Sequence, residues 1–84
     1  MTRLGKLLWR ILRGTNDANI RFDDLRNLLL NLGFEERTKG SHHVLRKTGV
    51  EEKINLQRDG SKAKPYQVRQ VRNVIQKYRL GDDL

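Results

Sequence analysis

Hydrophobic residues recur at helical spacing in three parts of the chain, and the strongest stripe lies before the middle. It consists of Phe22, Leu25, Leu28, Leu29 and Leu32. Residues at this spacing share one face of a helix, so the stripe predicts a helix that belongs to the core. Asp23 is the expected N-cap, Asp24 suits the positive N-terminal dipole, and Gly33 is the expected end.

Two further stripes predict a helix near each end of the chain. The first consists of Leu4, Leu7, Leu8 and Ile11. It predicts an amphipathic helix that Gly14 stops, followed by a polar connector at 15–19. The second consists of Val68, Val71, Val74, Ile75 and Tyr78. Pro65 fits the first position of that last helix, and Gly81 can end it.

The region between the second and third stripes predicts short strands. We expect strands at 34–38 and 42–47, separated by a turn at 39–41, and a further turn at 48–49. A third strand follows, in which the alternation of residue types places Ile54 and Leu56 in the core. The residues that this alternation turns toward solvent or a ligand are Lys53, Asn55 and Gln57. The Gly, Ser and Lys-rich stretch 58–64 predicts a loop.

The order helix, helix, three strands, helix predicts an α+β fold. Three antiparallel strands with two helices on one face leave the other sheet face uncovered. This α-β-β-β-α arrangement is typical of a double-stranded-RNA-binding-like (dsRBD-like) domain, here with an extra N-terminal helix. We therefore divide the chain into an N-terminal helix and connector (1–19), the dsRBD-like domain (20–80) and a frayed tail (81–84).

Size and composition narrow the function classes. At 84 residues the chain has room for one domain and no deep substrate cavity. It contains no cysteine, which excludes disulfides and thiolate metal sites and favours a reducing cytoplasm. No segment has the apolar length of a membrane span, and the start of the chain lacks the pattern of a signal peptide. The first helix could rest on a membrane surface, but so short a helix more often covers a core, so we expect no membrane partner.

The charge of the chain favours a polyanionic partner. Lys and Arg number 18 against 10 Asp and Glu, which gives a formal net charge of +8. On so small a surface this excess favours a polyanion, such as a nucleic acid, as a partner. The alternative is that the charge only keeps the chain soluble.

The sequence Gly40-Ser41-His42-His43 is the first candidate site. Glycine permits the positive φ that a tight turn can require, serine offers a small donor, and histidine moves protons near neutral pH. Neighbouring strand residues point to opposite faces, so only one of the two histidines should be catalytic. The plain alternative is a pair of exposed polar residues. Two histidines on opposite faces are also a poor metal-ligand set, and we expect no metal.

A basic helix start is the second candidate site. Lys62 and Lys64 flank the expected N-terminus of the last helix, where free N–H groups and the helix dipole attract phosphate. Arg69 and Arg72, one turn apart, extend this into a basic strip that we place on the solvent side. The alternative is a helix start that is merely solvated.

Together these segments resemble the HicA-type (YcfA-like) toxins of bacterial toxin–antitoxin pairs. The resemblance rests mainly on Gly40-Ser41-His42-His43, Ile54-Asn55-Leu56-Gln57 and Lys62-Ala63-Lys64-Pro65-Tyr66-Gln67-Val68. It extends over nearly the whole length. The chain departs from many compact members by its extra N-terminal helix and by Arg46-Lys47-Thr48-Gly49, where they often carry a His-Pro pair.

The resemblance implies a dsRBD-like fold and a metal-independent endoribonuclease that cuts mRNA and stops translation. It places the functional histidine directly after Gly-Ser, at His42. It implies a HicB-type antitoxin as partner and no cofactor. Phosphate contacts are then expected from Gly40, Ser41, Lys62, Lys64, Arg69 and Arg72. His43, Lys53, Asn55 and Gln57 are secondary candidates. A non-catalytic RNA-binding module that uses the same basic surface is the alternative.

Overall fold

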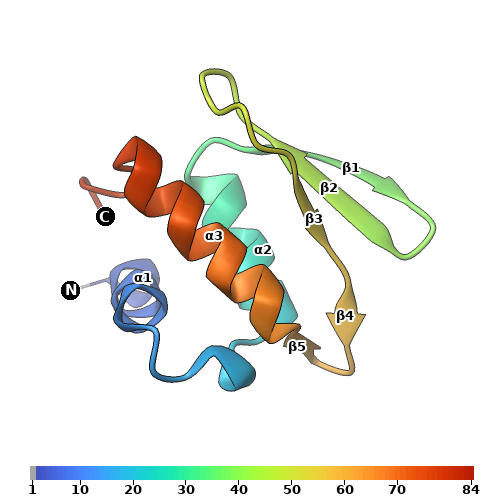
Figure 1. Cartoon of the computed structure of the whole chain (residues 1–84), viewed down its shortest axis with the longest axis horizontal. Helices are drawn as coiled ribbons and strands as arrows, with labels where there is room; N and C mark the ends of the chain where they lie inside the picture. The colour runs from blue at the N-terminus through green and yellow to red at the C-terminus, as the bar shows by residue number, and fades with distance from the viewer. Residues whose placement is uncertain (1) are drawn as a thin grey trace.

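The computed structural model describes residues 2–84 and shows helices packed against one face of a small antiparallel sheet (Figure 1). Met1, which belongs to the expected N-terminal unit, lies outside the described residues. The helices are α1 (Arg3–Arg13), the short 3₁₀ turn η1 (Asp17–Asn19), α2 (Phe22–Asn31) and α3 (Pro65–Tyr78). The strands are β1 (Glu35–Lys39), β2 (His42–Arg46), β3 (Ile54–Leu56), β4 (Arg58–Asp59) and β5 (Lys62–Ala63). The expected α+β class with a three-stranded antiparallel sheet is confirmed.

The three-stranded sheet has the order β1-β2-β3 with antiparallel neighbours. Lys39 pairs with His42 across the turn, and Val44 pairs with Asn55. The turn between β1 and β2 contains only Gly40 and Ser41. Lys39, which was expected in this turn, is the last residue of β1. The third strand is shorter than the expected stretch and begins at Ile54.

The expected loop at 58–64 is wrong, because these residues form a second hairpin. β4 and β5 pair antiparallel, with Gly60 in the turn at a φ of 62°. The two turn residues are Gly60 and Ser61, and a Gly-Ser pair favours such a two-residue hairpin turn. The hairpin is held from outside as well, because Ala63 N donates to Ile20 O (2.9 Å).

Two expected helix ends are also wrong. Asp23 is not the N-cap: α2 begins at Phe22, whose N–H donates to Ser61 O at 3.0 Å, and the Asp23 carboxylate instead accepts a hydrogen bond from Arg58. α3 ends at Tyr78, with Arg79 in the left-handed conformation, before Gly81 is reached. The residues of the expected frayed tail form a turn in which Leu84 N donates to Gly81 O (3.0 Å).

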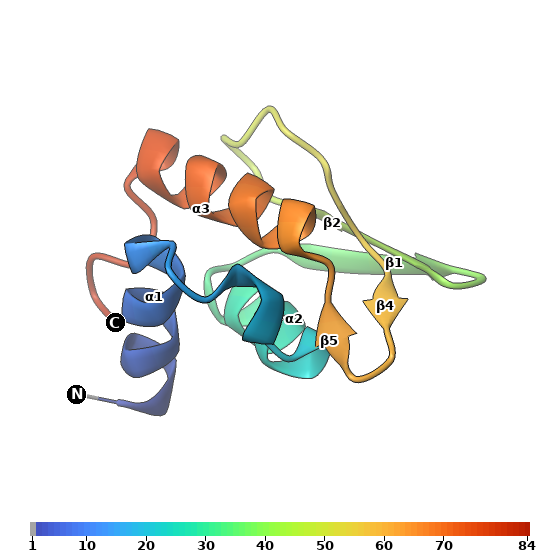
Figure 2. The ribbon, with the colours of Figure 1, turned by 60° about the horizontal axis from the view of Figure 1, so that its bottom comes forward.

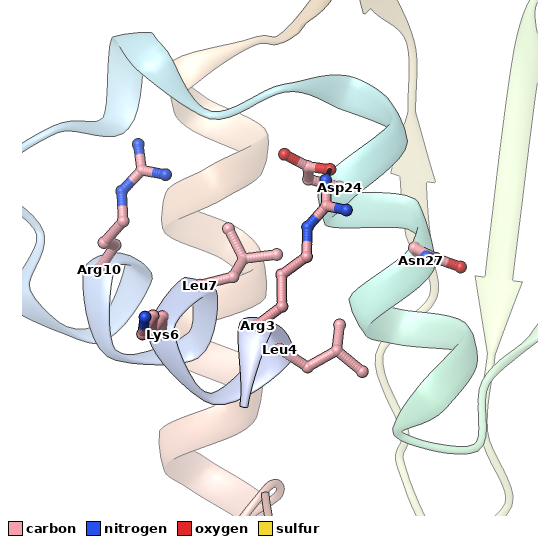
Figure 3. Close-up of a pocket in the computed structure, with 7 residues that line it drawn as sticks. All are labelled: Arg3, Leu4, Lys6, Leu7, Arg10, Asp24 and Asn27. Carbon is pink, nitrogen blue, oxygen red and sulfur yellow. Dashed lines mark ion pairs between the residues drawn. The ribbon is translucent and has the colours of Figure 1, made fainter. Parts of the chain in front are cut away.

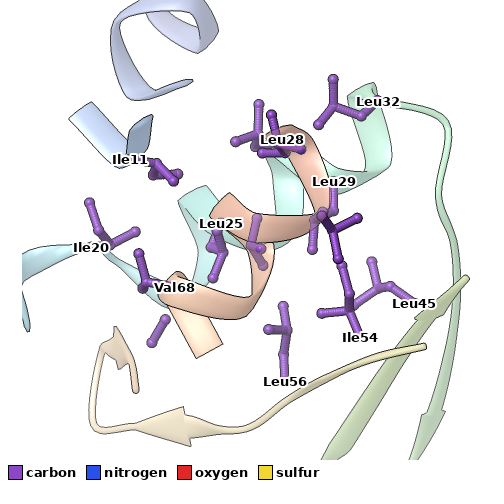
Figure 4. Close-up of a cluster of buried hydrophobic side chains, with 14 of the residues drawn as sticks. Ile11, Ile20, Leu25, Leu28, Leu29, Leu32, Leu45, Ile54, Leu56 and Val68 are labelled. Carbon is purple, nitrogen blue, oxygen red and sulfur yellow. The ribbon is translucent and has the colours of Figure 1, made fainter. Parts of the chain in front are cut away.

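One hydrophobic core joins the sheet to the three α-helices (Figure 4). Ile11 of α1, Leu25 of α2 and Ile54 of β3 are completely buried in it. The helical stripes expected from the sequence supply most of its members, and the alternation in β3 places Ile54 and Leu56 inward as expected. Burial of these residues fixes which face of the sheet is covered, and therefore which residues remain outside. Within residues 2–84, no helix has the length and apolar character that crossing a bilayer requires.

Candidate nucleic-acid interface

The sheet face turned away from α2 and α3 carries the residues of one strand parity. We call this the open face; its residues are Glu35, Arg37, Lys39, His42, Val44, Arg46, Lys53 and Asn55. All are exposed except Val44, which is half-buried. Four of them are cations and one is a carboxylate, so the face is basic. A shallow pocket over it is lined by residues of β1 and β2 and by Lys53, which immediately precedes β3.

His42 stands at one end of the open face, where β2 begins. Its side chain is exposed, and its Nδ1 lies 3.4 Å from Asn55 Oδ1 on the neighbouring strand. An amide oxygen only accepts hydrogen bonds, so this contact requires the proton on Nδ1. In this tautomer Nε2 is the ring nitrogen that carries the lone pair, which is what a general base needs. Lys39 is directly opposite His42 in the register.

A second set of polar contacts lies beside His42. Gln57 Nε2 donates to Ser41 Oγ (3.4 Å), and Lys64 Nζ donates to Gln57 Oε1 (3.5 Å). Long polar contacts of this kind place side chains near one another without fixing them tightly. They bring the hairpin turn, the end of β3 and the residue before α3 together. The structure thus gathers five of the predicted site residues: Ser41, His42, Asn55, Gln57 and Lys64.

Gly40 shapes the turn that carries Ser41 and His42. Its φ is 60°, and a Cβ placed there would meet no atom within 4 Å. Glycine is therefore needed for the backbone conformation and not for space. The two-residue turn fixes the register that sets Lys39 opposite His42.

His43 lies on the other face of the sheet, as the alternation predicted. Its side chain is 19% exposed, its ring meets the Phe22 ring edge-on at 4.9 Å, and its Nδ1 donates to Glu36 at 3.0 Å. Glu36 also accepts two hydrogen bonds from Arg26, each 2.6 Å long. These bonds, chiefly those from Arg26, lower the pKa of the Glu36 carboxyl. His43 is therefore part of a network that joins β1 and β2 to α2.

The other predicted phosphate ligands do not join His42. Lys62 Nζ donates to Asn19 Oδ1 (2.9 Å), on the side of η1. Arg69 is exposed on α3. The expected solvent position of Arg72 is wrong: its side chain is 16% exposed and donates to Asp17 Oδ1 (2.9 Å) and Ile11 O (3.2 Å). Helical spacing showed that Arg69 and Arg72 are neighbours on α3, but it could not show that Arg72 would form an ion pair with Asp17.

Several exposed residues near the site were not among the predicted ones. Arg37, Lys39 and Arg46 share the open face with His42, and their alternation along the strands could have revealed them. Tyr66, in the first turn of α3, is 54% exposed. It lies one helical turn before Gln70, which donates to Lys53 O on the approach to β3. Tyr66 is therefore an exposed aromatic ring two residues after Lys64.

The described residues contain no group of three or more His, Cys, Asp or Glu side chains placed to hold a metal ion. The chemistry visible at this surface is a histidine with a free ring nitrogen, amide groups and cations. No family model, no curated protein and no solved structure matches the chain.

Proposed function

We propose that this chain is an RNA-directed domain of dsRBD-like fold and acts as the endoribonuclease toxin of a HicA-type toxin–antitoxin pair. The observation that carries the proposal is the placement of His42. It stands on an exposed basic sheet face, with Asn55 on its Nδ1 and Lys39 and Lys64 on neighbouring elements. A proton carrier among cations, open to a large ligand, suits phosphoryl transfer within RNA.

The proposed reaction needs only groups of this chain and of RNA. Nε2 of His42 takes the proton of a ribose 2′-hydroxyl, and the 2′-oxygen forms a bond to the adjacent phosphorus. The bond from phosphorus to the 5′-oxygen breaks, and the imidazolium returns its proton to that oxygen. The products are a 2′,3′-cyclic phosphate and a 5′-hydroxyl. Lys39 and Lys64 stabilise the additional negative charge of the phosphorane.

The start of α3 is proposed to hold a neighbouring phosphate. Lys64 immediately precedes Pro65, and the positive end of the helix dipole adds to its charge. Tyr66 offers a ring on which an unpaired base can stack. Arg37 and Arg46 would contact the RNA backbone along the open face. Arg72 is excluded from this set because Asp17 already neutralises it.

The proposed partners are mRNA and a HicB-type antitoxin in the cytoplasm. An acidic antitoxin would complement the open face and cover His42, and its association rate would fall steeply with added salt. Protection of the α2–α3 side in place of the open face would contradict this arrangement.

Induced expression in cells tests the proposed function. The native chain should arrest growth and degrade mRNA, whereas His42→Ala should do neither. His43→Gln is the matched control, because it removes an imidazole from the opposite face and should leave toxicity in place if the protein stays folded. If His42→Ala arrested growth as strongly as the native chain does, the catalytic role of His42 would be contradicted.

A non-catalytic RNA-binding module is the second candidate. The four cations of the open face favour it, because they can hold a phosphate backbone without any proton transfer. In that case His42→Ala and the native chain would bind RNA equally and neither would yield products on a gel. Duplex binding would then weaken steeply with salt.

A further inference from the structure

We infer that the outer face of α1 is a docking surface for an acidic amphipathic segment of another protein. This surface goes beyond the proposed function, because it lies away from His42. In both ribbon views α1 and the strands β1 and β2 stand at opposite ends of the molecule (Figures 1 and 2). We define the outer face by its exposed residues Lys6, Trp9, Arg10, Leu12 and Arg13.

Two of the large hydrophobic side chains that the structure leaves exposed lie on this one helix. Trp9 is 50% exposed and Leu12 is 37% exposed. The other side of α1 is buried through Leu7, Leu8 and Ile11, so the helix already has its core contact. Packing of this core therefore does not explain why Trp9 and Leu12, on the exposed side of α1, are hydrophobic. Exposed Trp with Arg beside it is typical of residues that dominate protein–protein binding energy.

The charge of α1 determines what kind of partner fits. The helix contains four cations and no acidic residue: Arg3, Lys6, Arg10 and Arg13. A second copy of this chain, with its own net charge of +8, would be repelled. An acidic partner is complementary to the same surface.

A groove beside the outer face offers room for apolar side chains of that partner. It runs between α1 and α2 and is lined by Leu4 and Leu7, with Arg3, Lys6 and Arg10 along the α1 side (Figure 3). Across the groove Arg3 forms an ion pair with Asp24 (3.6 Å). Asp24 and Asn27 line the α2 side, so the groove has an apolar floor and is basic along α1 only. This fits a helix that places its hydrophobic face in the groove and its acidic face against α1.

RNA fits this surface less well than a protein segment does. A phosphate backbone would use the cations but leave Trp9, Leu12 and the groove unfilled. A base could stack on Trp9 only from one side, because the Arg13 guanidinium already lies 4.5 Å from the ring centroid. The observations therefore favour an acidic protein segment over RNA.

The structure holds α1 firmly, as a preformed binding surface requires. Thr2 Oγ1 accepts a hydrogen bond from Gly5 N (2.9 Å) at its start, and Gly14 closes its end in the left-handed conformation. Arg72 donates to Ile11 O, and Ile11 is completely buried. Because the helix is ordered before binding, docking costs little conformational entropy.

Fluorescence tests the inference directly, because Trp9 is the only tryptophan of the sequence. The probe is a synthetic peptide of about four helical turns with Glu on one face, Leu on the other and no aromatic residue. Titrated into the full chain at about 0.15 M salt, it should shift the Trp9 emission to shorter wavelength and saturate. A poly-Glu peptide of equal charge should bind at least about tenfold more weakly.

Matched variants separate docking from general attraction to a basic protein. Arg10→Glu, and independently Lys6→Glu, should weaken peptide binding about tenfold or more. Arg37→Glu removes the same charge from the open face and should change the affinity less than about twofold. Trp9→Ala, followed with a fluorescently labelled peptide, should also weaken binding about tenfold.

Three results would overturn the inference. The first is an absence of any emission shift with the peptide. The second is equal weakening by Arg37→Glu and Arg10→Glu, which would show that net charge alone attracts the peptide. The third is a single-stranded RNA oligonucleotide that shifts Trp9 emission at lower concentration than the peptide, which would assign the surface to nucleic acid.

Discussion

At the scale of single residues, the two adjacent histidines have different surroundings. His42 is exposed beside Asn55, whereas His43 is 19% exposed between Glu36 and Phe22. The alternation of a strand predicted this separation, and the register of β2 confirms it. The sequence could not show the partners, because Glu36, Phe22 and Asn55 come from three different elements.

His43 should matter for stability and His42 should not. His43→Ala removes a hydrogen bond to Glu36 and an aromatic contact, and should lower the free energy of unfolding by about 1–3 kcal/mol. His42→Ala should change it by less than about 0.5 kcal/mol, because the side chain is exposed. Urea unfolding of both variants measures this. Equal destabilisation by the two would contradict the structural role of His43.

Asn55 should position the His42 ring within the proposed site. Asn55→Ala removes the oxygen that accepts a hydrogen bond from His42 Nδ1. The rate of RNA cleavage should therefore fall about tenfold while RNA affinity is retained. Asn55→Asp retains an acceptor and, by its charge, should move the pH profile of cleavage upward. Asn27→Ala on α2 serves as the control. An Asn55→Ala protein with the native rate and pH profile would rule out this role.

At the scale of elements, the helical stripes and the sheet were predictable and the second hairpin was not. Periodicity reports burial, and the core indeed contains the predicted apolar stripes. β4 and β5 contain two residues each, too few for an alternation to be recognised, although the pair Gly60-Ser61 favours a two-residue hairpin turn. The start of α2 was misplaced because two residues distant in sequence act there: Ser61 O accepts the Phe22 N–H, and Arg58 binds the Asp23 carboxylate.

Arg72 should fasten α1 and its connector to α3. Arg72→Met keeps much of the apolar stem but leaves Asp17 without its ion pair and should lower the free energy of unfolding by about 1–3 kcal/mol. Arg69→Met, an exposed change one turn away, should alter it by less than about 0.5 kcal/mol. Thermal or urea unfolding checks the pair. A smaller effect of Arg72→Met than of Arg69→Met would contradict the contact.

At the scale of the whole molecule, basic charge and burial divide the chain into two surfaces around one core. The open face lies on one side, and the outer face of α1 lies at the other end (Figure 2). The net charge follows from the sequence, but the distribution of that charge between the two surfaces does not. The distribution depends on which arginines form ion pairs with carboxylates in the folded chain. Arg26 forms an ion pair with Glu36, and Arg72 forms one with Asp17. Arg37 and Arg46 are exposed.

Acid should destabilise the fold through Glu36. Its pKa in the folded chain is lowered below its ordinary value of 4.5, chiefly by hydrogen bonds from Arg26. A carboxyl with a lowered pKa contributes stability that is present above the unfolded pKa and is lost as the pH falls through the folded pKa. The free energy of unfolding should therefore decrease below about pH 4.5. In Glu36→Gln this decrease should be smaller. The same decrease of the free energy of unfolding with falling pH in both proteins would contradict the role of Glu36.

The most direct test of the central claim is cleavage of a defined RNA by purified protein in the presence of a metal chelator. The native chain should produce fragments that end in 2′,3′-cyclic phosphate, and it should leave DNA of the same sequence intact because DNA has no 2′-hydroxyl. His42→Ala should still bind the RNA and yield no product. Cleavage by His42→Ala at the native rate, or cleavage of the DNA by the native chain, would contradict the account.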